Sequence, residues 1–312
     1  MSSAPTSDPL FFTETDVRAL LRFDALIPAI EQALIDFSAG KVVQPVRSIL
    51  SAPEQAGHPA WFGLMPALYG KFVGAKLVTF YPGNAARRLP THNATIVLFR
   101  ADTGQPVAVL DGRLITEMRT AAVSAVATRA LTPPSANQLA ILGSGVQARS
   151  HLEALRLVRD FTRVAVWSSD PDHARKFAGE TGACLASTAE EAVRDADVVV
   201  TVTSAAEPIL RGEWLKPGAY VNAVGGVGLA RRELDTSVFS GATVVVESLD
   251  AALQESGEIL AAGATIHAEI GELLSGVKCL PPANRVIFKS LGIAVEDITA
   301  AAMVYTASDS SV

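Results

Sequence analysis

The chain has 312 residues, of which 49% are hydrophobic and 19% are charged, and its formal net charge at pH 7 is −6. This length suffices for two domains, each with a sizeable core. The acidic balance and the lack of a basic run argue against nucleic acid or an anionic membrane as a partner. No apolar run approaches the roughly 20 residues that span a bilayer, and no secretory signal is visible, so we expect a cytoplasmic protein. Cys184 and Cys279 lack Cys-x-x-Cys spacing, and no metal site is predicted.

The first part of the chain predicts one helix followed by several strands. The helix begins near Phe23, with Asp24 as a plausible cap, and ends at Gly40. Strand-like runs follow, separated by clusters of Pro, Gly and Asn, at residues 46–50, 61–65, 72–80, 95–99 and 107–110. Because no helices lie between these runs, they predict an antiparallel sheet or an open barrel.

A long helix is predicted from Arg113 to Leu131, ended by Thr132-Pro133-Pro134, and we interpret it as the bridge between two domains. From Gln138 onward, apolar strands alternate with helices. The predicted strands are residues 138–142, 163–167, 197–203, 219–224 and 243–247, and residues 287–292 are predicted as the last strand and the turn after it. This alternation predicts an α/β domain with a doubly wound parallel sheet, the Rossmann architecture. A last helix, residues 295–307, is expected to return to the first domain.

The strongest local motif is a glycine pattern that follows the strand beginning at Gln138. Gly143-Ser144-Gly145-Val146-Gln147-Ala148 has the form Gly-x-Gly-x-x-Ala and is followed by a segment with helical spacing. The first glycine permits a tight turn, the second lets a pyrophosphate approach the backbone, and the small Ala148 allows close packing of the helix on the strand. Unpaired N–H groups at the helix start then face the phosphates. The motif therefore predicts a dinucleotide site.

Three cations in the first part lie among apolar or small residues: Arg47, Lys76 and Arg119. A cation that faces a core must be paired or must bind an anion, since an isolated buried charge is costly. Each could be a solvated or salt-bridged side chain. Together, however, they form the kind of cluster that a small carboxylate substrate requires.

The sequence resembles the ornithine cyclodeaminase/mu-crystallin family over nearly its whole length. The resemblance is carried by Gln44-Pro45-Val46-Arg47, Gly63-Leu64-Met65-Pro66-Ala67, Lys76-Leu77-Val78-Thr79-Phe80-Tyr81, Arg119-Thr120-Ala121-Ala122-Val123-Ser124-Ala125, the glycine motif, Glu207-Pro208-Ile209-Leu210 and Phe288-Lys289-Ser290-Leu291-Gly292. It is strongest to the mu-crystallin branch, which comprises NADPH-dependent ketimine reductases that also bind thyroid hormone. The family is typically a homodimer whose first domains join through their sheets.

The resemblance implies roles for particular residues. Arg47, Lys76 and Arg119 would hold the substrate carboxylate, and Lys76 is also the candidate for proton handling. Glu255 matches a pocket carboxylate, although a solvated helix residue is an equal reading. Thr91-His92 matches a pair that reaches the cofactor of the other subunit, although His92 also reads as a turn histidine. The full set expected to bind the cofactor is Thr91, His92, Arg119, Thr120, Gly143, Ser144, Gly145, Val146, Gln147, Ser168, Ser169, Thr203, Val224, Ser290 and Gly292.

Two departures from the family pattern refine the expectation. Val227 falls where ornithine cyclodeaminases carry an aspartate that handles the substrate amine, so ornithine cyclisation is disfavoured. Ser168 stands where NAD-specific sites usually place an acid, which favours NADPH over NADH. Mu-crystallin-like proteins carry an arginine at the position of Ser169. That arginine is missing here, so NADH is not excluded as the cofactor. Asp170 before Pro171 predicts a helix cap.

We therefore expect a substrate-binding and dimerisation domain of residues 1–118 plus 296–312, and a dinucleotide-binding Rossmann domain of residues 119–295. The expected activity is NAD(P)H-dependent reduction of the C=N bond of a small 2-imino acid, with Δ1-piperideine-2-carboxylate and Δ1-pyrroline-2-carboxylate as leading substrates. The alternatives are reductive amination of the alanine dehydrogenase type, ornithine cyclodeamination, and non-catalytic binding of NADPH and a thyroid-hormone-like acid.

Overall fold

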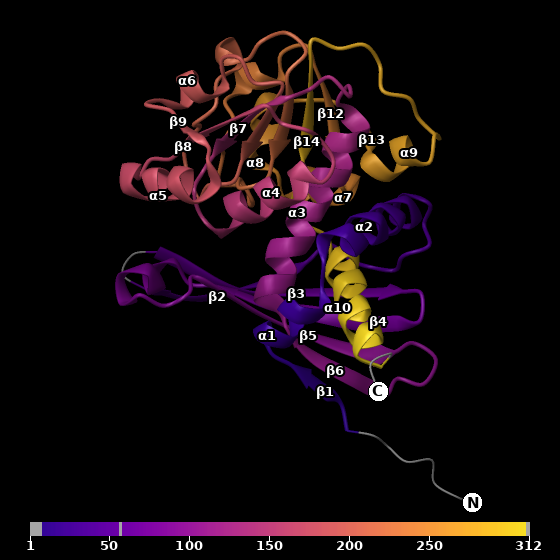
Figure 1. Cartoon of the computed structure of the whole chain (residues 1–312). Helices are drawn as coiled ribbons and strands as arrows, with labels where there is room; N and C mark the ends of the chain where they lie inside the picture. The colour runs from indigo at the N-terminus through magenta and orange to yellow at the C-terminus, as the bar shows by residue number, and fades with distance from the viewer. Residues whose placement is uncertain (1–7, 56–57, 310–312) are drawn as a thin grey trace, which may run out of the picture. The chain divides into compact units, whose positions relative to one another are not determined.

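The computed structural model describes residues 8–55 and 58–309, which fold into two compact units (Figure 1). The first unit comprises the chain up to Arg119 together with Ile293 onward, and the second comprises Thr120–Gly292. Helix α3 (Gly112–Leu131) begins in the first unit and continues into the second. Among the described residues, no helix is both long and apolar enough to cross a membrane.

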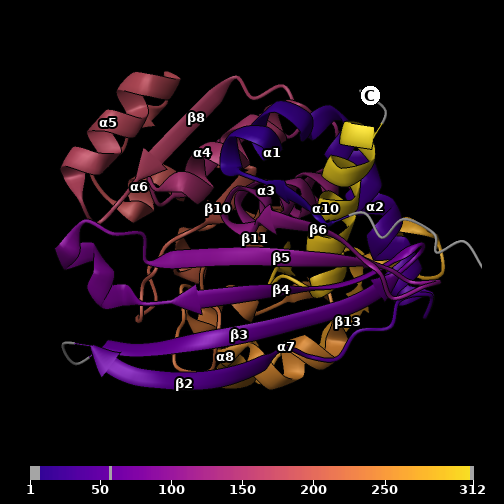
Figure 2. The ribbon, with the colours of Figure 1, turned by 90° about the horizontal axis from the view of Figure 1, so that it is seen from below.

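The first unit is built on one sheet with the strand order β1-β6-β5-β4-β3-β2. All pairings are antiparallel except that of β1 with β6, which is parallel. Figure 2 shows β5, β4, β3 and β2 side by side. The elements are β1 Leu10–Phe12, α1 Glu14–Leu20, α2 Phe23–Ser38, β2 Ser48–Gln55, β3 His58–Tyr69, β4 Phe72–Phe80, η1 Pro82–Arg87, β5 His92–Arg100, β6 Pro106–Asp111 and α10 Ala294–Asp309.

One face of this sheet is covered by α10, which packs on β3, β4, β5 and α2. The register places Met65, Lys76, Ile96 and Leu110 side by side on β3 to β6, and all four are buried. The alternation of side chains along a strand puts their neighbours on the opposite face. The covered face therefore forms the core of the first unit, with a lysine in the middle of it.

Some boundaries in the first unit differ from those that the sequence predicts. Helix α2 is capped at Arg22 without a side-chain hydrogen bond, so the prediction of Asp24 as its cap is wrong. Asp24 lies instead in the first turn, where its charge still favours the helix dipole. The edge strand β2 runs later than the predicted residues 46–50, because it pairs with β3 past the bulge near Ala52. Strand β1 was not predicted, and its parallel pairing makes the sheet mixed.

The second unit has an eight-stranded parallel sheet with the order β13-β12-β14-β11-β10-β7-β8-β9. The prediction of a doubly wound parallel sheet is confirmed. Its elements are β7 Gln138–Leu142, α4 Val146–Arg156, β8 Arg163–Trp167, α5 Pro171–Thr181, β9 Cys184–Leu185, α6 Ala189–Val193, β10 Val198–Thr201, η2 Gly212–Trp214, β11 Tyr220–Ala223, η3 Thr236–Phe239, β12 Ala242–Val246, α7 Leu249–Glu255, α8 Gly257–Ala262, β13 Ile266–Glu269, α9 Ile270–Leu274 and β14 Arg285–Lys289.

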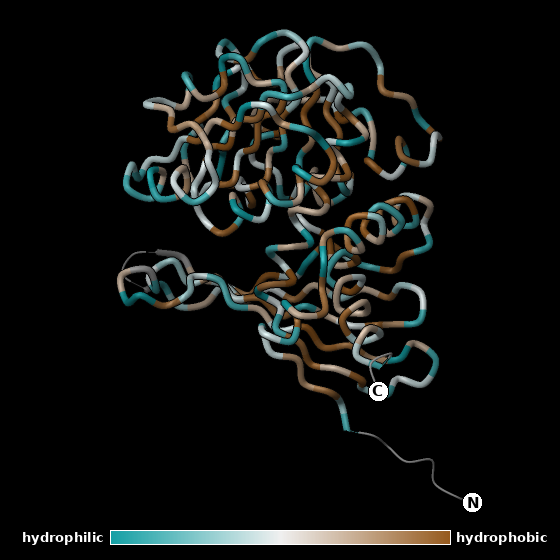
Figure 3. The backbone as a smooth tube through the Cα atoms, viewed as in Figure 1, coloured by the Kyte–Doolittle hydropathy of each residue, from teal (hydrophilic) through white to brown (hydrophobic). Residues whose placement is uncertain are grey.

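The central strands of this sheet are mostly apolar, as brown segments in Figure 3 show, because both faces are covered. The order in which strands are added reverses between β7 and β10. The chain adds β8 and β9 on one side of β7 and then returns to add β10 on the other side. In open parallel sheets of this kind, ligands bind outside the carboxyl ends of the strands at such a switch point. The topology therefore places the candidate nucleotide site at the ends of β7 and β10.

A buried histidine ties α3 to α4 within the second unit. His151 Nε2 lies 3.0 Å from Ser124 Oγ, and His151 Nδ1 lies 2.7 Å from the carbonyl oxygen of Gln147. Since the carbonyl only accepts, Nδ1–H donates to it and the neutral ring accepts from Ser124. Burial lowers the pKa of His151 to about 4, and the hydrogen bond to Gln147 opposes this shift.

This histidine predicts a loss of stability in mild acid. The unfolded chain takes up a proton near the ordinary pKa of 6.5, whereas folded His151 stays neutral until about pH 4, so stability is present above pH 6.5 and falls below it. At pH 5.5 the loss is about 1.4 kcal/mol. Urea unfolding of the wild type and His151→Gln at pH 7.5 and 5.5 measures it. His173→Gln, at an exposed site, is the control and should retain the slope; an identical slope in His151→Gln would contradict the assignment.

Candidate active site

Lys76 is the charged residue at the centre of the first unit. It lies in the middle of β4 on the face covered by α10, and only 2% of its side chain is exposed. Its cross-strand neighbours, Met65 and Ile96, are apolar and cannot neutralise it. A buried ammonium without a partner would cost several kcal/mol, so another element has to supply an anion.

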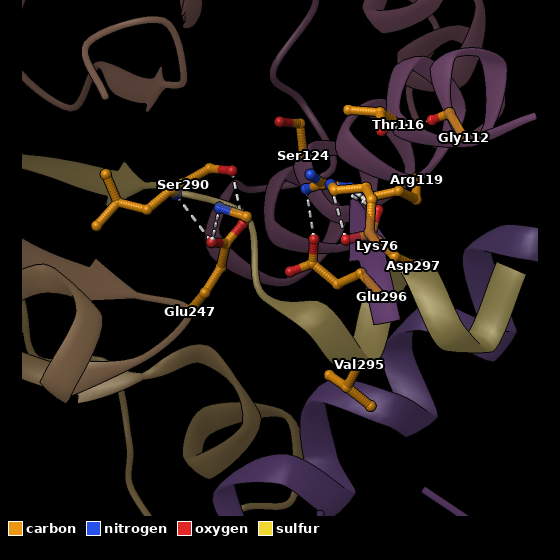
Figure 4. A network of polar contacts seen from close by, with 12 residues as sticks. Lys76, Gly112, Thr116, Arg119, Ser124, Glu247, Ser290, Val295, Glu296 and Asp297 are labelled. Carbon is orange, nitrogen blue, oxygen red and sulfur yellow. Dashed lines mark hydrogen bonds and ion pairs between the residues drawn. The ribbon is translucent and has the colours of Figure 1, made fainter. Parts of the chain in front are cut away.

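Helix α10 supplies that anion. Asp297 Oδ2 lies 2.8 Å from Lys76 Nζ, and Asp297 Oδ1 accepts hydrogen bonds from Lys76 Nζ at 2.9 Å and from Arg119 Nε at 3.0 Å (Figure 4). Arg119 Nη1 also donates to Glu296 Oε2 at 2.6 Å. Both carboxylates are fully buried. Asp297 therefore bridges the two cations, and Glu296 holds the far side of the Arg119 guanidinium.

Arg47 belongs to the same charged group. It is half-buried, and its charge acts on Lys76. The segment that carries it is tied to the start of α10, because the Val295 N–H donates to Gln44 Oε1 at 2.8 Å. The structure thus brings Arg47, Lys76 and Arg119 together, as predicted for a carboxylate site. Glu296 and Asp297 pair with Lys76 and Arg119, so the convergence of the cations does not by itself require a bound acid.

Burial, together with the positive charges of Arg119 and Arg47, lowers the pKa of Lys76 to about 8. Asp297 opposes this shift by its charge and its hydrogen bond. An amine in this range gives up and takes back a proton near neutral pH, as a general acid or base must.

The two carboxylates were missed in the sequence although a signal for them was present. Glu296 and Asp297 stand side by side in an apolar stretch that begins with Ile293-Ala294-Val295. The reasoning that singled out cations among apolar residues applies equally to anions there. Applied to both signs, it marks Glu296 and Asp297 as buried anions that need cationic partners, without saying which.

The nucleotide motif of the second unit has the geometry that a dinucleotide requires. Gly143 has φ of +124°, and a Cβ there would lie 2.7 Å from the carbonyl oxygen of Val202. Gly145, the N-cap of α4, has open space where a Cβ would stand, and no side chain caps the helix. The buried Oε1 of Gln147 has no hydrogen-bond partner among the described residues. An open glycine and an uncapped helix start fit a bound pyrophosphate.

The segment after β8 is the expected adenosine side of this site. Ser168 is half-buried and Ser169 is exposed, so neither hydroxyl is shut away in the core. Asp170 caps α5, as predicted: its carboxylate accepts from the N–H groups of Asp172 and His173, both at 3.0 Å. Asp170, the acid nearest to the end of β8, is therefore already hydrogen-bonded to the first turn of α5.

At the carboxyl ends of β10 and β11, a buried glutamate organises the loops. Glu233 Oε1 accepts from Thr203 N at 2.6 Å, and its Oε2 accepts from Thr201 Oγ1 at 2.7 Å and from Gly225 N at 2.8 Å. Burial raises the pKa of Glu233, while the Thr201 hydrogen bond and the Lys289 charge oppose the rise. Thr203 and the buried Val224, both predicted cofactor residues, lie in the two loops that Glu233 joins.

The turn after β14 is held by another buried carboxylate. Glu247 accepts from Ser290 Oγ at 2.5 Å, from Leu291 N at 2.8 Å and from Gly292 N at 2.6 Å (Figure 4). Gly292 has φ of +75°, a conformation that glycine adopts without strain. The predicted cofactor residues Ser290 and Gly292 thus belong to a rigid turn, and the hydroxyl of Ser290 is already committed to Glu247.

The remaining predicted residues are Thr91, His92, Glu255 and Thr120. Thr91 and His92 lie at the start of β5, with Thr91 Oγ1 3.1 Å from His92 Nδ1 and the His92 ring against Phe80. Glu255 is half-buried at the end of α7, and Thr120 is buried in α3. Among the described residues, no group of His, Cys, Asp and Glu could hold a metal ion. The roles of these residues stay predictions.

Comparison with known proteins identifies the class to which this fold and these sites belong. A sequence profile of the ornithine cyclodeaminase/mu-crystallin family matches residues 7–311. The chain belongs to this family. It is 45% identical over 307 residues to ketimine reductase mu-crystallin of Mus musculus, with 95% of this chain and 96% of that protein covered.

Two solved structures share the whole fold. Δ1-Pyrroline-2-carboxylate reductase of Thermococcus litoralis, in complex with NADH and L-proline, superposes with a TM-score of 0.90 at 33% identity and covers 97% of this chain and 98% of that chain. An archaeal alanine dehydrogenase dimer with bound NAD superposes with a TM-score of 0.91 at 32% identity and covers 97% of each chain.

The two glycines of the nucleotide motif predict opposite consequences of substitution. Gly145→Ala should fold normally, because open space surrounds its Cβ, yet weaken NADPH binding, because the methyl group takes the space of the pyrophosphate. Gly143→Ala should lower stability, because its Cβ would clash with the Val202 carbonyl at a positive φ. NADPH fluorescence titration and thermal unfolding of both variants test this. Unchanged NADPH affinity in Gly145→Ala would contradict the site.

Proposed function

We propose that this protein is an NAD(P)H-dependent reductase of the C=N bond of small cyclic 2-imino acids. Δ1-Piperideine-2-carboxylate and Δ1-pyrroline-2-carboxylate are the leading substrates. The observation that carries the proposal is the convergence of three cations, the buried Lys76 and Arg119 and the half-buried Arg47, with the charges of both arginines acting on Lys76. The proposal is supported by the similarity to a ketimine reductase and to a Δ1-pyrroline-2-carboxylate reductase, proteins named for reactions on such imines.

The cations would bind the substrate through its carboxylate. Arg47 offers a planar fork that can bind both carboxylate oxygens, and Lys76 offers a point charge. Arg119 is held by Glu296 and Asp297, so its guanidinium has a fixed orientation before substrate arrives. Fixing the carboxylate also fixes the neighbouring C2 of the imine, and orientation of this kind contributes much of the rate enhancement in two-substrate reactions.

The cofactor is a nicotinamide dinucleotide, with NADPH preferred and NADH accepted. When bound, it supplies the hydride. Gly143, Gly145 and Gln147 would hold its pyrophosphate. Ser168, in place of an acid, would leave room for a 2′-phosphate, and Asp170 would not repel it as directly because its carboxylate caps α5.

The protonation state of the imine decides how readily it accepts a hydride, because an iminium carbon is more electrophilic than a neutral one. We propose that Lys76 supplies this proton or keeps it on the substrate. Its pKa of about 8 makes it a competent acid near neutral pH. Asp297 stays beside the amine and stabilises its charged form.

We further propose that the protein is a homodimer joined through the uncovered face of the first unit's sheet. This face carries exposed apolar side chains, among them Phe11, Leu50, Leu64 and Leu68. Leu50 pairs with Phe62 across β2 and β3, so the apolar side chains are contiguous there. Contiguous exposed apolar surface of this kind marks an interaction site, and the structural relative with alanine dehydrogenase activity is described as a dimer.

One activity screen separates the proposed reaction from its rivals. NADPH and NADH oxidation should be fast with the two cyclic imines and at least tenfold slower with pyruvate plus ammonia. Ornithine should not be cyclised, because Val227 cannot pair with its amine. A higher kcat/KM for pyruvate with ammonia would instead indicate an alanine dehydrogenase. Tight NADPH binding without turnover of any of these compounds would indicate a binding protein.

The carboxylate site predicts a substrate-dependent effect of Arg47→Ala. Loss of one charge-assisted hydrogen bond costs roughly 1.5–3 kcal/mol, which lowers kcat/KM for the imino acid by about one to two decades. The methyl ester of the same imine lacks the carboxylate, so it should be a poor substrate of the wild type and nearly indifferent to the substitution. Arg100→Ala, which removes an exposed arginine paired with Asp102, is the matched control. Equal losses for acid and ester in Arg47→Ala would contradict the assignment.

A further inference from the structure

An ion pair lies fully buried inside the second unit, and neither of its residues is among those predicted to bind the cofactor. Lys289 is the last residue of β14, and Glu258 is in the first turn of α8. Lys289 Nζ lies 3.0 Å from Glu258 Oε2, and neither side chain is exposed at all. A buried pair of this kind contributes little net stability compared with apolar side chains of the same volume. Its presence therefore calls for another explanation than stability.

The pair holds both ends of one segment. Lys289 Nζ donates to the carbonyl oxygen of Gly226 at 2.8 Å. Glu258 Oε1 accepts from Glu233 N at 2.5 Å and from Leu234 N at 3.1 Å. The chain from Gly226 to Glu233 is thus a loop whose two ends are fixed by the same two charges.

The chain is closely packed at the start of this loop. A Cβ on Gly226 would lie 2.6 Å from Glu258 Oε1. A Cβ on Gly225 would lie 2.2 Å from the carbonyl oxygen of Thr203 and 2.5 Å from Glu233 Oε1. The two consecutive glycines are therefore required by the approach of buried carboxylates and backbone.

The loop occupies a functional position in the sheet. It follows β11. In the sheet, β10 and then β11 lie on one side of the glycine-motif strand β7, and β8 lies on the other side, across the switch point. A dinucleotide binds across such a switch point, with one nucleotide half over each side of the sheet. The β7–β8 side carries the glycine motif, so the other half of the cofactor, which contains the nicotinamide, falls to the ends of β10, β11 and β14.

We infer that Lys289 and Glu258 are positioning residues that hold the loop of residues 226–233 in place against the nicotinamide half of the cofactor. This inference rests on the proposed function in that the loop's purpose is the alignment of the hydride donor. A loop shift of about 1 Å can cost on the order of 100-fold in rate even far from the chemistry. Binding of the pyrophosphate by the glycine motif does not depend on the pair.

The test uses the full-length double variant Lys289→Met/Glu258→Gln. It removes both charges together, so neither member of the pair remains as an unpaired buried charge. The glutamine oxygen can still accept from Glu233 N and Leu234 N. The hydrogen bond from Lys289 to the carbonyl oxygen of Gly226 is lost. The control is Lys278→Met, which breaks the solvent-facing pair of Lys278 with Glu272 in the same unit.

In the double variant, the Kd for NADPH should stay within about threefold of the wild type, while kcat with saturating cyclic imine should fall by about 10- to 100-fold. The primary kinetic isotope effect with 4-deuterated NADPH should rise, because hydride transfer becomes more nearly rate-limiting. The control should match the wild type in all three. A wild-type kcat and isotope effect in the folded double variant would overturn the inference.

Hydrogen exchange provides a readout that does not need turnover. In the wild type, NADPH should slow exchange in a peptide covering residues 225–234 and in one covering residues 143–150. In the double variant, protection of the first peptide should be lost and that of the second retained. If NADPH protects both peptides equally in the double variant, the inference is overturned, whether or not the wild type reduces an imine. A wild type that reduces no imine counts only against the proposed function. Should the double variant not fold, Lys289→Met alone, which releases the Gly226 carbonyl and leaves Glu258 able to take up a proton, is expected to show the same selective loss, and its absence would likewise overturn the inference.

Discussion

The carboxylate of Asp297 holds together the charged centre of the first unit. Lys76 in β4 and Arg119 in α3 would repel each other in a low-dielectric core, and Asp297 in α10 lies within hydrogen-bond distance of both. Glu296 binds Arg119 from the other side. In the proposed function, Arg47, Lys76 and Arg119 bind the carboxylate of a small acid. Burying these charges is costly unless they stay together.

The second unit uses buried carboxylates in the same manner at the ends of its parallel strands. Glu233, Glu247 and Glu258 each accept two or more hydrogen bonds from loop backbone or hydroxyl groups. These bonds join segments that follow β10, β11 and β14, where we infer that the nicotinamide half of the cofactor binds. Preorganised loops lose little conformational entropy on ligand binding, and rigid support of this kind is what precise hydride transfer requires.

Much of this arrangement could be predicted from the sequence. Strands 72–80 and 163–167 were predicted with the bounds that the structure has, because each is a continuous apolar or alternating run between turn residues. The glycine motif and the cap at Asp170 are short-range patterns, and local geometry alone determines them. The carboxylates could not be assigned in the same way, since Asp297 and Lys76 are 221 residues apart in the chain. Only the packing of α10 on β4 makes them partners.

The pH dependence of catalysis tests most directly whether the Asp297-centred ion network sets the chemistry. The measurement is kcat/KM for one cyclic imine between pH 6 and 10, for the wild type and a folded Asp297→Asn variant. In the wild type, activity should fall above about pH 8 as Lys76 loses its proton. Asp297 raises the pKa of Lys76, so its neutralisation should move this fall to lower pH, while the titration of the substrate is common to both enzymes. An alkaline limb at the same pH in both enzymes would contradict the account.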